Sequence, residues 1–288
     1  MEFLVSILVI GTSNALLAAG IVIIYKASRV VNFAHGELAI VGAYVFYSAG
    51  MLVPGNSLPL TIAATALISA AFGVAIYAAL MRRLVGQPTF VAAMVTIGIA
   101  IILKAAIVVL WHSRSVGLNI GKQTLLTYAE GGRLTLVDVV TLVAGVVFFG
   151  GLFIFFRHTG LGRQFRGAAE NPLLASQRQV NVNLILAFAW GMAVFSAALA
   201  GVLFGSRSML SPQSTVIGLN GLTAALVGGL DSLRGAVFGG LLVAAATYLT
   251  ARMIDPALSD AVPFLILLLV MCWRPWGVFG RPEELNRV

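Results

Sequence analysis

Few side chains in this sequence have the chemistry to catalyse a reaction or to bind a metal ion. The chain has three histidines, His35, His112 and His158, and a single cysteine, Cys272. None of them has the spacing of a zinc site, and the sequence has no Gly-x-Ser-x-Gly nucleophile motif. Segment 117–124 lacks the glycine spacing of a phosphate-binding loop. We therefore expect a protein that is not an enzyme, with no catalytic residue, no metal and no cofactor of its own.

A second group of polar residues lies within or beside long apolar runs, where such side chains often line a transport path. The candidates for a translocation path or gate are Asn14, Asn32, His35, Glu37, Lys104 and Asp231. Lys104 lies near the middle of the apolar run 90–111, where a lysine costs about 2.5–3.5 kcal/mol on insertion scales. It either reaches toward the membrane surface, packs within a helix bundle or lines a wet path. For His35 a paired structural imidazole is the alternative, and for Asp231 a turn or helix cap.

The composition shows what kind of protein must position these residues. The chain has 288 residues, 60% of them hydrophobic and 10% charged, with a mean hydropathy of +1.01. Soluble domains carry roughly 25% charged residues, and disordered chains are far less apolar. A soluble enzyme and a disordered protein are both excluded, and a polytopic membrane protein is indicated.

The apolar residues fall into nine runs separated by polar or glycine-rich segments. The runs are 3–25, 37–52, 58–80, 90–111, 136–156, 183–205, 219–230, 235–251 and 260–273. Since a bilayer-spanning helix needs about 20 residues, we expect an all-α fold of about eight to nine transmembrane or half-membrane helices in one domain, 1–288. The short glycine-rich runs 37–52, 219–230 and 235–251 indicate broken or re-entrant helices. The pairs Gly201/Gly205 and Gly235/Gly239 lie one helical turn apart and are expected to allow close helix packing.

The chain has a net charge of +8, and its basic residues are scattered between the apolar runs. This pattern is typical of residues that set the orientation of membrane helices, so we expect no nucleic-acid partner. Placing loops 81–89 and 157–182 in the cytoplasm gives the stronger positive-inside bias. The N-terminus is then outside and the C-terminus is cytoplasmic. The inside regions hold Lys26, Arg29, Arg82, Arg83, Arg157, Arg163, Arg166, Arg178, Arg234, Arg274, Arg281 and Arg287, and the outside regions hold Arg114, Lys122, Arg133, Arg207 and Arg252.

Three blocks of sequence are more distinctive than any single residue. The first runs through 11–16, 29–38 (R-V-V-N-F-A-H-G-E-L) and 42–44; the second through 159–171, Ala175, 180–182 and 198–203; the third through 227–236, 239–240 and 274–280 (R-P-W-G-V-F-G). In this order and spacing they closely resemble the permease subunits of branched-chain amino-acid ABC importers. The resemblance covers nearly the whole chain.

The resemblance implies an inner-membrane permease within a larger bacterial transporter. Its partners would be two cytoplasmic ABC ATPases that bind the ATP, a second permease (a related heterodimer more than a homodimer), a periplasmic solute-binding protein docked chiefly on 112–135, and the surrounding lipid bilayer. Loop 157–182 would dock on an ATPase through Arg163, Arg166, Gly167, Ala168, Ala169, Glu170, Asn171 and Arg178. The solute would be a branched-chain amino acid or a related small polar solute such as urea or a short amide.

Two positions depart from the family pattern. Gln179 stands where the family commonly has glycine after the docking helix, and Lys104 stands where we expect an uncharged polar residue. The spans around Thr247 also lack a glutamate that relatives often carry. The Gln179 departure bears on the geometry of the helix exit, and the other two bear on the identity of the solute. Two rival functions also stay open. One is a stand-alone secondary transporter of a small polar solute, and the other is a membrane assembly factor that transports nothing.

Overall fold

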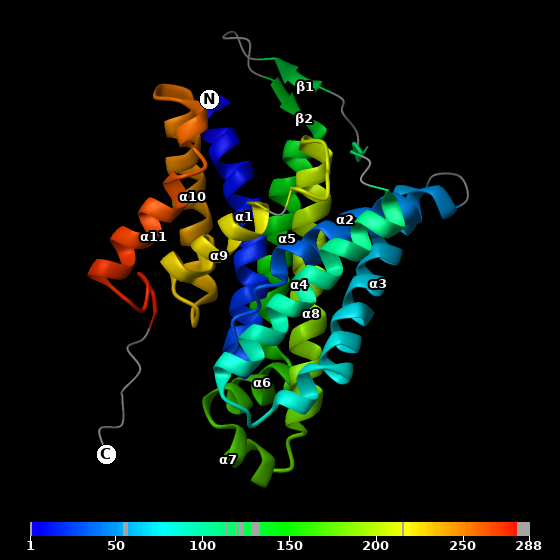
Figure 1. The fold of residues 1–288 in the computed structure, drawn as a ribbon, viewed down its shortest axis with the longest axis vertical. Coiled ribbons are helices and arrows are strands. Elements are labelled where there is room, and N and C mark those ends of the chain that lie inside the picture. The colour runs from blue at the N-terminus through cyan, green and yellow to red at the C-terminus, as the bar shows by residue number, and fades with distance from the viewer. Residues whose placement is uncertain are drawn as a thin grey trace.

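The structure, a computed structural model, describes residues 2–53, 57–112, 115–118, 120, 124–127, 133–214 and 216–280, and it is a helical bundle with one small hairpin (Figure 1). The helices are α1 (Glu2–Ser28), α2 (His35–Leu52), α3 (Leu58–Ala79), α4 (Thr89–Trp111), α5 (Leu136–His158), α6 (Gly160–Glu170), α7 (Pro172–Gln177), α8 (Val182–Arg207), α9 (Val216–Gly228), α10 (Leu233–Met253) and α11 (Val262–Trp273). Short 3₁₀ turns span Met81–Leu84 and Pro256–Leu258, and strands β1 (Thr124–Thr127) and β2 (Arg133–Thr135) pair antiparallel.

Within the described residues, six helices are long and apolar enough to cross a membrane: α1, α3, α4, α5, α8 and α10. In α1 and α8, 72% of the most apolar stretch is buried, so these two helices form the centre of the bundle. The same share is only 22–28% in the other four, whose outward faces carry exposed apolar side chains. The all-α polytopic prediction is confirmed, and each expected apolar run lies in one helix. The hairpin was not expected, and Arg114, Lys122, Arg281 and Arg287 lie outside the described residues.

Small residues set the contacts at the centre of the bundle. The Ser196 hydroxyl on α8 donates a hydrogen bond to the Leu16 carbonyl on α1 at 2.5 Å, which requires the two backbones to lie close. Gly201 packs on the backbone of Ala39 in α2, and Gly235 and Gly239 pack on the backbone of α9. Gly205 instead meets the Leu118 side chain, in a loop. Three of the four predicted packing glycines therefore lie against a helix backbone.

Helices α2 and α9 begin in the middle of the bundle. The ring of His35, the first residue of α2, packs against Gly20 within α1. Gly36 and Gly218, near the starts of α2 and α9, lie backbone to backbone. From there α2 runs obliquely outward to the side where α3 begins, and α9 runs down the opposite side of the bundle (Figure 1). These are the re-entrant segments that the sequence predicts, but α10 is a full-length helix of 21 residues because it extends at both ends beyond the apolar run.

The two halves of the chain are related by an inverted repeat. Helices α1 to α4 correspond to α8 to α11 with opposite direction: α1 packs on α10 as α8 packs on α3, and α2 packs on α8 as α9 packs on α1. The two halves meet at the centre through Leu16 with Ser196 and Gly36 with Gly218. Inverted repeats of this kind occur in many transporters.

The tail motif 274–280 closes the end of α9. The amides of Val278 and Phe279 donate to the carbonyls of Val227 and Gly228 at 2.9 and 3.0 Å. Carbonyls in the last turn of a helix have no partner within that helix, so the tail supplies donors that a half-membrane helix would otherwise lack. The two separated parts of the third sequence block, 227–236 and 274–280, therefore come together in one local structure.

Candidate functional site

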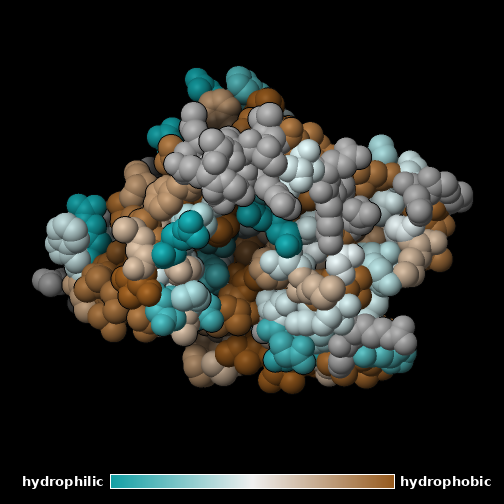
Figure 2. Space-filling view, turned by 90° about the horizontal axis from the view of Figure 1, so that it is seen from above, coloured by the Kyte–Doolittle hydropathy of each residue, from teal (hydrophilic) through white to brown (hydrophobic). Residues whose placement is uncertain are grey.

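The six predicted path residues do not form one site. Asn14, Asn32 and His35 lie inside the bundle, Glu37 and Lys104 lie together on α2 and α4, and Asp231 lies at the end that holds α6 and α7. Seen from the opposite end, where the hairpin lies, hydrophobic residues form the flanks of the molecule and hydrophilic residues gather around a central hollow (Figure 2).

The residues at the break before α2 are fully packed. Asn32 and His35 are each 1% exposed, and Asn14 on α1 is 7% exposed. The Asn32 side-chain oxygen accepts a hydrogen bond from the Ala34 amide at 3.0 Å, so it closes the turn that starts α2. The His35 ring fills the space beside Gly20. The Asn32 side chain and the His35 ring thus pack the helix break from within the subunit, and Asn14 is buried elsewhere on α1.

Glu37 and Lys104 lie on two helices that run side by side. Tyr44 of α2 stacks on Trp111 of α4 with ring centroids 5.1 Å apart, and the Trp111 indole donates to the Ser48 hydroxyl at 2.9 Å. Glu37 lies about two turns before Tyr44, and Lys104 about two turns before Trp111. The Phe33 amide, just before α2, also donates to the Thr96 hydroxyl on α4 at 3.2 Å, so the two helices run in the same direction and Glu37 lies level with Lys104. Glu37 is half-buried and Lys104 is exposed.

Asp231 pairs with a residue from the other half of the repeat. Its carboxylate lies 2.9 Å from the Arg29 guanidinium, which also lies over the Tyr25 ring. Beside this pair is a cavity of about 480 Å³, whose lining includes Arg29, Tyr77, Met81, Glu170, Leu186 and Trp190. The ion pair therefore joins the end of α1 to the α9–α10 turn next to this cavity.

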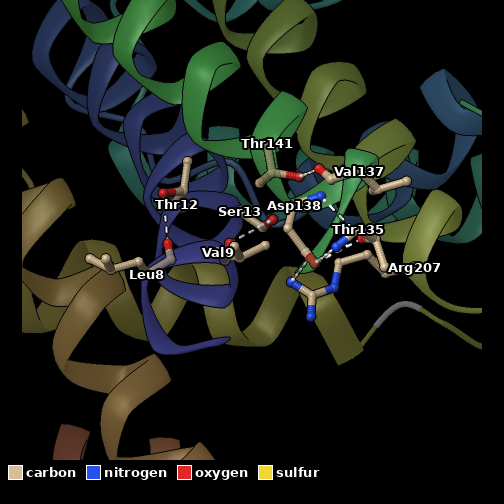
Figure 3. Close-up of polar contacts among 9 residues, drawn as sticks. All are labelled: Leu8, Val9, Thr12, Ser13, Thr135, Val137, Asp138, Thr141 and Arg207. Carbon is tan, nitrogen blue, oxygen red and sulfur yellow. Dashed lines mark hydrogen bonds and ion pairs between the residues drawn. The ribbon is translucent and has the colours of Figure 1, made fainter. Parts of the chain in front are cut away.

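The hairpin end holds a second ion pair, which the sequence analysis missed. Arg207, at the end of α8, lies 3.2 Å from the buried carboxylate of Asp138 in the first turn of α5 (Figure 3). Asp138 also accepts hydrogen bonds from the Thr135 amide and hydroxyl at 2.9 and 2.7 Å. Threonine three residues before an acid, ahead of an apolar run, is a capping-box signal. That signal could have identified Asp138, but nothing local could have identified Arg207.

Removing the Arg207 charge should destabilise the protein through Asp138. In Arg207→Met the buried carboxylate loses its counter-charge, and we expect a loss of about 1–3 kcal/mol. A thermal melt of the purified protein in detergent measures this loss. The double variant Arg207→Met/Asp138→Asn should recover most of it, because no unpaired charge remains. A double variant as unstable as the single one would show that the ion pair is not the cause.

Helices α6 and α7 form a compact projection at the end of the bundle opposite the hairpin (Figure 1). Thr159 caps α6 by accepting from the Gly162 amide at 2.9 Å, and Asn171 caps α7 by accepting from the Leu174 amide at 3.0 Å. Phe165 and Ala168 lie in a core cluster with residues of α1, α5 and α8. Ala168 is 3% exposed, so it supports the segment from beneath and offers no surface to a partner.

The opposite face of α6 and α7 carries the charged residues. Of the predicted docking residues, those exposed are Arg163, Arg166, Gly167, Glu170, Asn171 and Arg178, while Ala169 is half-buried. The segment thus has an apolar face fixed to the bundle and a polar face open to a partner. This arrangement suits a docking element that transmits movement, because the docked face is rigidly joined to the bundle helices.

The exit from α7 contains the departure noted in the sequence. Gln179 has a φ of 61°. The Val180 amide donates to the Ala175 carbonyl and the Gln179 amide to the Ser176 carbonyl, at 3.1 and 3.0 Å. This is the helix-ending motif in which glycine is preferred at the left-handed position. Gln179 adopts the geometry that glycine would adopt, with added backbone strain.

We expect Gln179→Gly to stabilise the protein by up to about 1 kcal/mol, because glycine has no Cβ to clash at positive φ. The melting temperature in detergent should rise by about two degrees for a chain of this size. Gln179→Ala is the matched control and should give no gain, since alanine retains the strain. A lower melting temperature for the glycine variant would contradict this account.

Comparison with known proteins agrees with this helical architecture. Residues 3–271 match the family described as branched-chain amino acid transport system, permease component. The chain belongs to this permease family. The permease is 30% identical over 296 residues to the high-affinity branched-chain amino acid transport system permease protein BraD of Pseudomonas aeruginosa, covering 98% of this chain and 96% of that protein. It is 30% identical over 287 residues to LivH of Escherichia coli, covering 95% and 93%.

A more distant relative, a probable LivH of Methanocaldococcus jannaschii, is 27% identical over 283 residues, covering 92% of this chain and 88% of that protein. No solved structure matches the permease. Family membership and the six apolar spans make it a multi-pass inner-membrane component of a bacterial ABC transporter, with a transport role and not an enzymatic one.

Proposed function

We propose that this permease moves a branched-chain amino acid, or a related small polar solute such as urea or a short amide, into the cytoplasm. Separate ATPase subunits hydrolyse the ATP, and a periplasmic binding protein delivers the solute. The observation that carries the proposal is the match to the permease family along nearly the whole chain, together with the exposed α6–α7 projection. The printed names of the relatives concern branched-chain amino acids, which favours that solute class.

The α6–α7 projection is the site where an ATPase would act. Its buried face contacts α5 and α8, so closure of two docked ATPases would displace α8, which lies at the centre of the bundle. Glu170 and Trp190, the latter on α8, both line the 480 Å³ cavity. A displacement of the projection would therefore reshape the cavity at the same end. A packed helix pair transmits such a shift because packed interiors have low compressibility.

The α6–α7 end would lie in the cytoplasm and the hairpin end outside, in agreement with the distribution of basic residues. The binding protein would dock on segment 112–135, which includes β1 and β2. A second permease, related but not identical, would complete the pathway, with lipid around the remaining surface.

Reconstitution into liposomes tests the proposal. The permease with its partner permease, two ATPases and binding protein should accumulate labelled leucine only with internal ATP, while the permease alone should not. Uptake by the permease alone, driven by an ion gradient, would support a secondary transporter instead. A cell that lacks this chain but keeps full uptake would support an assembly role.

A further inference from the structure

Glu37 and Lys104 form the one pair of opposite charges on the α2–α4 surface among the described residues. Glu37 lies half-buried in the first turn of α2, which begins in the middle of the bundle. Lys104 is exposed on the subunit surface. Contacts before and after them, Phe33 with Thr96 and Tyr44 with Trp111, place the two residues level with each other on neighbouring helices. No direct ion pair joins them within the described part of the chain. A mid-membrane lysine that faces outward without a direct partner requires an explanation other than packing inside the subunit.

The surroundings of the pair are apolar and exposed. Ile101 and Val108 lie on the same side of α4 as Lys104, one turn before and one turn after it, and Phe33 lies in the segment just before α2. Phe33, Ile101 and Val108 are 43%, 66% and 40% exposed. The surface therefore has two separated opposite charges within an aliphatic and aromatic frame. A ligand with matching chemistry would carry one positive group, one negative group and an aliphatic side chain.

From this juxtaposition we propose that Glu37 and Lys104 form a binding station for a zwitterionic aliphatic amino acid on the translocation path, with the solute carboxylate at Lys104 and the solute ammonium at Glu37. The inference rests on the proposed transport function and narrows its substrate class. Urea and neutral amides have no charges to satisfy the pair. Simple anions are repelled by Glu37 and simple cations by Lys104, so only a ligand that carries both charges gains from both residues.

Two structural roles compete with this assignment. Lys104 could reach toward the membrane surface along α4, and Glu37 could serve only to stabilise the first turn of α2. Either role predicts a uniform effect of substitution on every ligand. The station predicts effects that depend on which charge the ligand carries, and this difference is the basis of the test.

The test uses the complete transporter, purified with its partner permease and ATPases, and three ligands of similar shape. Leucine carries both charges, isoamylamine only the ammonium and isocaproate only the carboxylate. Binding is measured by isothermal titration in the absence of binding protein, and leucine uptake in liposomes is measured in parallel. The variants are Lys104→Met and Glu37→Gln, and the control is Arg252→Met, which removes a positive charge from the end of α10.

We expect Lys104→Met to weaken leucine binding about tenfold or more and to leave isoamylamine binding unchanged or tighter. Glu37→Gln should weaken leucine similarly and leave isocaproate unchanged or tighter, while Arg252→Met should match the parent. The inference is overturned if Lys104→Met leaves the leucine affinity and the uptake KM unchanged, or weakens all three ligands equally. Loss of the partner permease from the purified complex would also overturn it. If the parent complex carries urea or amides but no aliphatic amino acid, both the inference and the amino-acid form of the proposed function fail.

Discussion

Replacement of Gly218 by alanine is expected to destabilise the folded permease by about 3 kcal/mol or more. A Cβ at Gly218 would overlap the Cα of Gly36, so two backbones at the centre of the inverted repeat would have to move apart. Overpacking of a well-packed core costs typically 1–3 kcal/mol, and backbone atoms cannot rotate away as a side chain can. The melting temperature and the monodisperse yield in detergent measure the effect.

Gly98 provides the matched control, because it is also helical but a Cβ there meets nothing within 4 Å. Gly98→Ala should be neutral or stabilise α4 by up to about 1 kcal/mol, since alanine favours helix. Gly36→Ala should reproduce the defect of Gly218→Ala. If Gly218→Ala melts at the parent temperature, the close meeting of α2 and α9 is wrong.

The second large effect concerns coupling to ATP hydrolysis. Glu170→Lys reverses the charge of an exposed residue at the end of α6 and should reduce ATP-driven uptake about tenfold or more, because like charges across a docked interface cost several kcal/mol. The folded permease should be unaffected, since the carboxylate lies on the exposed face. Uptake and ATP hydrolysis by the complete transporter are measured together, and we expect hydrolysis without matching uptake.

Gln87 lines the same cavity as Glu170 but lies in a loop outside α6 and α7. Gln87→Lys therefore controls for an effect of added charge on the cavity, and it should leave uptake near the parent level. Glu170→Gln should fall between the two. Full coupling in Glu170→Lys would argue against this face as the docking site. Equal losses in Glu170→Lys and Gln87→Lys would indicate a general effect of charge at this end of the protein.

Apolar run length predicted the helices well, because the bilayer requires runs of a particular length and polarity. The segments around Gly36 and Gly218 were expected to be broken, since they are short and rich in glycine. The amphipathic α6–α7 segment was also recognisable, because its charged and small residues contrast with the runs on either side. These features are all local in the sequence.

The features that were not predicted depend on which distant segments meet. Nothing near Asp138 specifies Arg207 as its partner. Ala168 follows Phe165 by three residues on the apolar face of α6, but a small side chain suits a buried face and a docking face alike. The depth at which α2 and α9 start follows from the contact of Gly36 with Gly218, 182 positions apart. The predicted path residues are scattered for the same reason. A polar residue in an apolar run is unusual, but its polarity does not show where in the folded bundle it lies.

The central position of α1 has a consequence for biosynthesis. This helix is made first, yet the helices that bury it, α8, α9 and α10, emerge more than a hundred residues later. At about 5–20 residues per second, the interval is on the order of ten seconds. During that time the faces that later contact α8 and α10, and the Asn14 amide, have only lipid or the insertion machinery as neighbours. The strong hydrophobicity of α1 therefore serves to hold an unpartnered helix in the bilayer until the second half of the repeat arrives.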